Sequence, residues 1–136
     1  MIKPKLKETL NQKIQNGEFR VGDFSDYFKL FCHLGNTVED LQDEVEGWDR
    51  KIQIDMNGSG CYWISVDNGE FTTGEGIIED AHLILSASAE ATVKVFSGEL
   101  DGEAAFLSGA LKVSGDLPDA IKFHEMIELV IEEIEY

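Results

Sequence analysis

The sequence predicts an α+β domain in which helices cover a five-stranded, mostly antiparallel sheet. Residues 5–47 and 117–134 carry apolar side chains at a helical spacing, whereas residues 51–86 alternate with the period of two that is typical of strands. A fifth strand is expected at residues 110–114, between helical segments. Helices, an antiparallel meander and further helices around one more strand indicate two packed layers in one globular unit. A chain of 136 residues can bury such a core without disulfides or metals.

The charge of the chain limits its partners. The formal net charge is −16 at pH 7, and residues 1–22 alone hold five basic and two acidic side chains, so the remainder carries −19. Proteins bind nucleic acids and anionic membranes largely through basic side chains that neutralise the phosphates. A chain this acidic repels both, so we expect neither nucleic-acid binding nor stable membrane insertion. The two cysteines, Cys32 and Cys61, imply no disulfide framework and favour a reduced, cytoplasmic protein.

Three helices are expected before the sheet. The first covers residues 5–16, where leucine and isoleucine recur every four residues, and Gly17 ends it. The second follows Asp23, ends at Gly35-Asn36 and has an unusually aromatic apolar face, made of Phe24, Tyr27, Phe28, Leu30, Phe31 and Leu34. Thr37 is expected to cap the third, at residues 38–47, whose acidic outer face suits exposure to solvent.

The strands follow from an alternating pattern. Residues 51–56 and 61–66 alternate on either side of the turn at 57–60, and Asn68-Gly69 predicts a tight hairpin into a third strand at 71–76. The fourth strand, 82–86, contains Leu83, Ile84 and Leu85 in succession. Because such a continuous apolar run is typical of a strand buried on both sides, we expect both faces of this strand to be covered.

The stretch from residue 96 to residue 118 is punctuated by glycines. Ser88 is expected to cap a helix that reaches Phe96 and ends at Gly98, and Asp101 to cap a short helix that ends at Gly109. The final helix, residues 117–134, has one apolar stripe that is widened by Ile121, Met126 and Leu129. The sequence alone supports two interpretations of these additional apolar residues equally: they belong to a thickly packed core, or they form the wall of a ligand cavity.

The sequence lacks the usual combinations of catalytic residues. The three histidines, His33, His82 and His124, lie on three different predicted elements, and no nucleophile elbow, phosphate loop or dinucleotide fingerprint is present. His124 shares a helix face with Glu128 and Glu132, which favours an exposed histidine–glutamate pair over a metal site in an oligomer. We therefore expect no catalytic residues, no metal and no cofactor.

Residues 98–117, Gly-Glu-Leu-Asp-Gly-Glu-Ala-Ala-Phe-Leu-Ser-Gly-Ala-Leu-Lys-Val-Ser-Gly-Asp-Leu, resemble the signature of the sterol carrier protein 2 (SCP-2) lipid-transfer family. The resemblance covers about residues 37–136 and implies a single SCP-2-like lipid-binding domain with an apolar tunnel. Residues 1–36 lie outside the resemblance and are expected to form an N-terminal helical extension packed on this domain. A homodimer contact through its helices and a cover over the tunnel mouth are the two other roles that remain open for this extension. The chain ends at Tyr136 and not in a peroxisomal Ser-Lys-Leu.

The resemblance implies non-catalytic binding or transfer of a fatty acid, an isoprenoid or a sterol-like lipid. The strong acidity argues against acyl-CoA, because the C-terminal half offers only Lys94, Lys112 and Lys122 as bases. The expected ligand-binding residues are Val93, Phe96, Leu100, Phe106, Leu111, Val113, Leu117, Ile121, Met126 and Leu129.

Two other functions remain open from the sequence. The first is a protein-interaction module with a closed core, in which the aromatic helix 24–34 serves an assembly with another protein. The second is an enzyme that uses His124 or a carboxylate as a base on a lipid-like substrate.

Overall fold

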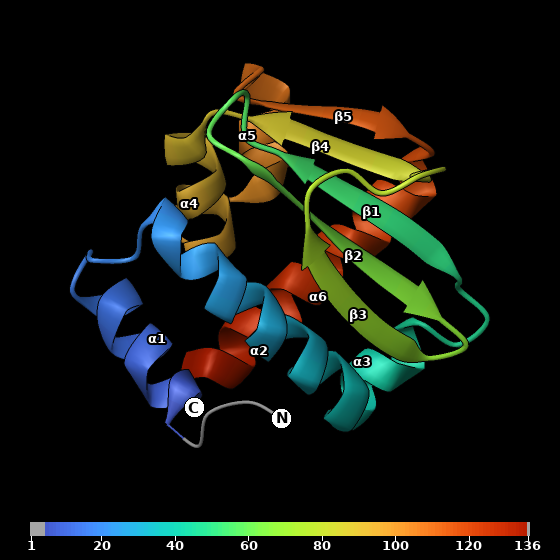
Figure 1. The fold of residues 1–136 in the computed structure, drawn as a ribbon, viewed down its shortest axis with the longest axis horizontal. Coiled ribbons are helices and arrows are strands. Elements are labelled where there is room, and N and C mark those ends of the chain that lie inside the picture. The colour runs from blue at the N-terminus through green and yellow to red at the C-terminus, as the bar shows by residue number, and fades with distance from the viewer. Residues whose placement is uncertain (1–4, 136) are drawn as a thin grey trace.

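The structure, a computed structural model, describes residues 5–135 and shows helices gathered on one face of a five-stranded sheet (Figure 1). The helices are α1 (Leu6–Gln15), the short 3-10 turn η1 (Val21–Asp23), α2 (Phe24–Thr37), α3 (Glu39–Glu44), α4 (Ala89–Ser97), α5 (Gly102–Ser108) and α6 (Leu117–Glu135). The strands are β1 (Arg50–Asp55), β2 (Cys61–Asp67), β3 (Glu70–Glu75), β4 (Leu83–Ala87) and β5 (Leu111–Gly115). The predicted α+β fold class is confirmed.

The strand order is β3-β2-β1-β4-β5, and the sheet is mostly antiparallel, as predicted. The expected four-strand meander is wrong in one respect, because β4 crosses over to pair with β1 in parallel. Gln53 holds the crossover: its side-chain amide donates to Tyr62 O and Gly76 O, and its Oε1 accepts from Ile78 N. The loop after β3 is therefore tied across the face of the sheet opposite the helices.

The expectation that β4 is covered on both faces is also wrong. Leu83 is fully buried and Leu85 is 8% exposed, but Ile84, which points to the other face, is 38% exposed. The reason lies in the layer arrangement, since the helices pack on only one side of the sheet (Figure 1).

Helix α2 extends further than predicted, and Thr37 is not the cap of α3. The Thr37 hydroxyl donates to His33 O at 2.8 Å within α2, and α3 begins only at Glu39. Asn36, which we expected to help end the helix, instead pairs with the edge strand β3: its amide donates to Phe71 O at 3.1 Å and its Oδ1 accepts from Phe71 N at 2.8 Å. The contact with β3 thus sets the end of this helix.

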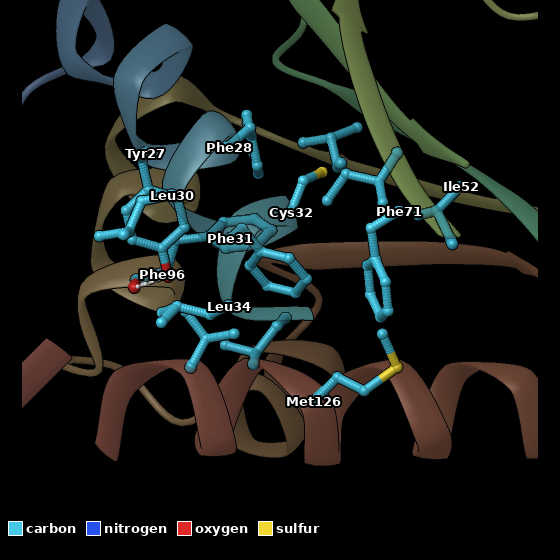
Figure 2. Packing of buried hydrophobic residues seen from close by; sticks show 14 of the residues in the cluster. Tyr27, Phe28, Leu30, Phe31, Cys32, Leu34, Ile52, Phe71, Phe96 and Met126 are labelled. Atoms are coloured by element: carbon cyan, nitrogen blue, oxygen red, sulfur yellow. Dashed lines mark hydrogen bonds between the residues drawn. The ribbon is translucent and has the colours of Figure 1, made fainter. Parts of the chain in front are cut away.

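The aromatic face of α2 forms the centre of the hydrophobic core (Figure 2). Phe24, Tyr27 and Phe31 have no exposed surface, and the Tyr27 hydroxyl donates to Phe96 O of α4 at 2.7 Å. From the other side, Met126 of α6 points into the cluster toward Phe71 (Figure 2). Because these aromatic side chains are buried, they are unavailable as the partner surface that the interaction-module hypothesis requires.

A buried carboxylate fixes the start of α6 to the sheet. Asp119, 6% exposed, accepts from Trp48 Nε1 at Oδ1 and from Arg50 Nε at Oδ2, both at 2.9 Å. Burial by itself would raise the pKa of Asp119, but the two hydrogen bonds and the Arg50 charge outweigh it and hold that pKa below its usual value. Further along, Lys122 Nζ donates to Glu44 O at 2.9 Å and so joins α6 to α3.

Cys32 is buried and Cys61 is half-buried, and the structure records both as free thiols. Burial raises the pKa of the Cys32 thiol to about 12, so this side chain stays protonated and unreactive at neutral pH. Within residues 5–135, no helix is both long enough and apolar enough to cross a membrane.

Candidate functional site

An apolar cavity of about 420 Å³ lies between the helix-covered face of the sheet and α4, α5 and α6. Its walls come from β1, β4 and β5 on the sheet side and from the three helices on the other. The lining residues are Ile54, Leu85, Ala87, Thr92, Val95, Phe96, Gly102, Glu103, Phe106, Leu107, Leu111, Val113, Leu117, Ala120, Ile121, Phe123, His124 and Ile127.

The register of the paired strands determines which side chains form the sheet side of the cavity. Leu85 of β4 lies opposite Val113 of β5, and Ala87 lies opposite Leu111. Directly opposite residues of an antiparallel pair project to the same face, so these four side chains form one apolar floor. Ile54 of β1, in register with Leu85, extends this floor toward the middle of the sheet.

The short helix α5 covers the cavity between two sharp backbone turns. Asp101 caps its start by accepting from Ala104 N at 3.1 Å, as predicted. Gly98 before it and Gly109 after it have φ of +85° and +84°, a conformation that residues with a Cβ rarely adopt. The two glycines let the chain leave α4, cross the cavity and return as β5.

The rim of the cavity exposes large apolar side chains to solvent. Phe106 and Leu107 of α5 are 45% and 76% exposed, and Leu117 and Ile121 of α6 are 62% and 52% exposed. Single exposed apolar residues are ordinary on a protein surface, but four at the rim of one apolar cavity make this cavity the candidate binding site.

Few polar groups reach the cavity. Thr92 is buried and its hydroxyl donates to Ser88 O at 2.8 Å, so this hydroxyl is already engaged. Glu103 is exposed to solvent. His124 is 28% exposed, and its Nε2 lies 3.0 Å from Glu128 Oε1 and 3.5 Å from Asp101 Oδ1. In the part of the chain that the structure describes, no group of three His, Cys, Asp or Glu side chains is arranged to hold a metal ion.

The structure brings six of the ten predicted ligand-binding residues together on the cavity wall: Phe96, Phe106, Leu111, Val113, Leu117 and Ile121. Leu100 lies instead in a neighbouring hollow of about 430 Å³ beside Glu128, and Val93 in a hollow of about 290 Å³ between α1 and α4. Met126 is fully buried in the central core, and Leu129 packs against that core. The structure therefore places these last four away from the cavity.

Sequence reasoning missed several lining residues. Leu85 and Ala87 could have been found, because β4 pairs with β5 and their alternation matches that of Leu111 and Val113. On α6 the cavity face follows a 117-121-124 spacing, which runs from Leu117 through Ile121 to His124. His124 was missed as a lining residue because a histidine beside glutamates is more often simply exposed.

The fold and the cavity define a class: small α+β domains that hold an apolar cavity between one face of a sheet and its covering helices. The sequence profile of the SCP-2 sterol transfer family matches residues 28–128. The chain belongs to this family, and its membership supports lipid binding or transfer.

Curated relatives contain this domain as one part of a larger protein. The chain is 28% identical over 127 residues to the Bos taurus hydroxysteroid dehydrogenase-like protein 2, a match that covers 91% of this chain and 29% of that protein. The chain thus spans less than a third of the length of that relative.

Solved structures share the fold at low sequence identity. A UbiJ-SCP2 ubiquinone synthesis protein matches with a TM-score of 0.61 and 18% identity, over 78% of this chain and 93% of that one. A crystal structure of sterol carrier protein 2 matches with a TM-score of 0.60 and 16% identity, over 78% of this chain and 94% of that one. At these identities the likeness shows the fold alone.

Proposed function

We propose that this domain binds or transfers a hydrophobic small molecule of the lipid class in the cavity, and that it does so without catalysing a reaction. The observation that carries the proposal is the continuity between the exposed apolar rim and the apolar interior, from Leu117 and Ile121 inward to Leu111 and Val113. A rim of this kind lets an apolar ligand leave water stepwise.

In such a site, the length of the ligand's apolar chain contributes more to the binding free energy than the ligand's polar groups do. Burying each methylene of a ligand gains about 0.8 kcal/mol, so a long chain gains on the order of 10 kcal/mol before losses. Much of this gain is offset by ordering and by lost translational freedom, which leaves moderate net affinity. Fatty acids, isoprenoids and sterol-like lipids all fit this description as candidate ligands.

The predicted tunnel would require the cavity to join the hollow of about 430 Å³ beside it. The two share Val95, Gly102, His124 and Ile127 in their walls. Movement of the half-buried His124 side chain would connect them, so we propose that this residue stands at the narrowest part of the tunnel.

The enzyme hypothesis has less support. Of the lining residues that the structure describes, Thr92 alone carries a hydroxyl, and that group donates to Ser88 O. His124 faces two carboxylates, Asp101 and Glu128, and apart from this engaged hydroxyl no hydroxyl or thiol occurs among the described residues that line the cavity. Covalent catalysis needs a nucleophile within hydrogen-bonding reach of its base.

Native mass spectrometry of the purified protein, followed by organic extraction, tests the proposal. We expect a lipid-sized mass that is lost on denaturation. Ala120→Trp should abolish this mass by filling the cavity, whereas the matched Ala104→Trp, at an exposed position of α5 outside the lining, should retain it. Thermal unfolding of both variants checks that they fold.

The proposal would be contradicted by a lipid-free mass for the wild-type protein that persists after incubation with mixed fatty acids, isoprenoid alcohols and sterols. It would also be contradicted by a folded Ala120→Trp variant that binds lipid as well as Ala104→Trp does.

A further inference from the structure

We propose that the cavity selects uncharged amphiphiles whose polar end donates a hydrogen bond, such as long-chain alcohols, over carboxylates and phosphates with the same chain. This inference rests on the proposed function and narrows its ligand class. The observations behind it are the directions in which the basic side chains point and the kind of hydrogen-bonding groups that the cavity offers.

Of the lining residues in the described chain, none is a lysine or an arginine. The three bases of the C-terminal half are directed elsewhere. Lys94 pairs with Glu90 at 3.2 Å on α4, and Lys122 donates to Glu44 O at 2.9 Å on the α3 side of α6. Lys112 alternates on β5 with Leu111 and Val113, which line the cavity, so it projects from the opposite face of the sheet.

Arg50 offers no free positive charge either. Its Nε donates to Asp119 Oδ2 at 2.9 Å, and its Nη1 donates to Asp49 O at 2.8 Å. The ion pair with Asp119 neutralises the guanidinium beside the first turn of α6. A ligand carboxylate or phosphate would therefore meet no unpaired base among the residues that form the cavity and its sheet-side support.

The polar side chains at the cavity are either acidic or already engaged by other groups of the protein. Glu103 presents a carboxylate. The Nε2 of His124 lies 3.0 Å from Glu128 Oε1 and 3.5 Å from Asp101 Oδ1, so this nitrogen is engaged by protein carboxylates.

These features favour a hydroxyl over an anion. A ligand hydroxyl can donate to Glu103, whereas a carboxylate finds no lysine or arginine among the lining residues and is repelled by Glu103, Asp101 and Glu128. A like charge a few ångströms away at a partly exposed site weakens binding by roughly tenfold or more.

The test is a matched pair of probes that differ only in the polar end: 1-dodecanol and dodecanoate, titrated calorimetrically into delipidated protein at about pH 7.5, where the acid is ionised. We expect the alcohol to bind at least about tenfold more tightly than the acid. Glu103→Lys should narrow this ratio several-fold, and the milder Glu103→Gln should narrow it in the same direction.

Glu39→Lys is the matched control, because Glu39 also lies exposed in the first turn of a helix but outside the cavity lining. It makes the same change in net charge and should leave the ratio unchanged. Two outcomes would overturn this inference and leave the proposed function standing. One is that the wild type binds dodecanoate as tightly as 1-dodecanol or more tightly, and the other is that Glu39→Lys and Glu103→Lys change the affinity ratio equally. If neither probe binds, the inference is overturned, and the proposed function fails with it only if fatty acids, isoprenoid alcohols and sterols also leave the protein free of lipid.

Discussion

At the scale of single residues, Asp119 shows how one side chain positions the cavity. Its two carboxylate oxygens hold Trp48 and Arg50, and the next residue along α6, Ala120, lines the cavity. The first turn of α6, with Leu117 at the rim, is thereby fixed against β1 and the segment before it.

Asp119→Asn should therefore destabilise the fold. An amide can accept only one of the two hydrogen bonds and carries no charge for Arg50, so we expect a loss of about 2 kcal/mol in the free energy of unfolding near neutral pH. Urea denaturation measures it. Asp67→Asn, at an exposed position of β2, is the control and should change stability by less than about 0.5 kcal/mol.

The same variant has a defined pH dependence. The pKa of Asp119 is lowered from 3.8 in the folded protein, so its contribution is present above that value and is lost as the pH falls through the folded pKa. The stability gap between wild type and Asp119→Asn should consequently narrow in acid. A gap that stays constant down to about pH 3 would contradict this linkage.

Local signals predicted the residue-scale features that depend on neighbours in sequence. Ser88 and Asp101 cap their helices, and Asn68-Gly69 forms the expected tight turn. The role of Thr37 was missed because Asn36 is held by Phe71, a partner 35 positions away that no local pattern reveals.

At the scale of elements, the packing of α2 on β3 depends on a glycine. A Cβ on Gly35 would lie 2.6 Å from Phe71 Cγ, and Phe71 is only 2% exposed and has little room to move. Gly35→Ala should cost about 1–3 kcal/mol in the free energy of unfolding through overpacking, although alanine normally stabilises a helix relative to glycine.

Gly22→Ala is the matched comparison, because nothing lies within 4 Å of a Cβ at Gly22 and its backbone φ is compatible with alanine. Thermal or urea unfolding should show it as stable as the wild type or slightly more stable. Equal stability of the two variants would show that the approach of α2 to β3 is looser than the structure indicates.

The elements themselves were largely predictable, and their spatial order was less so. Alternation, the Asn68-Gly69 turn and the continuous apolar run at residues 83–85 located the strands. The crossover of β4, however, depends on Gln53 binding a loop that follows β3, which none of these patterns encodes. On α6 the apolar stripe was evident, yet Met126 faces the core while Ile121 faces the cavity rim, and only the packing of the helix separates the two.

At the scale of the whole molecule, one chain contains two apolar regions with different roles. The central core, around Phe31 and Phe96, is filled by aromatic side chains, whereas the region under α5 is left hollow. The division into residues 1–36 and 37–136 stays a prediction, as does a homodimer through the N-terminal helices. The family profile begins at residue 28, inside α2.

The most direct test of the central claim is to map ligand contacts by NMR on the ¹⁵N-labelled, delipidated protein during titration with 1-dodecanol. We expect amide shifts at Leu111 and Val113 of β5 and at Ala120 and Ile121 of α6, with the amide of Ile77, on the loop after β3, unaffected. Shifts centred on Ile77, or no shifts at the cavity residues in a protein that binds the probe, would contradict it.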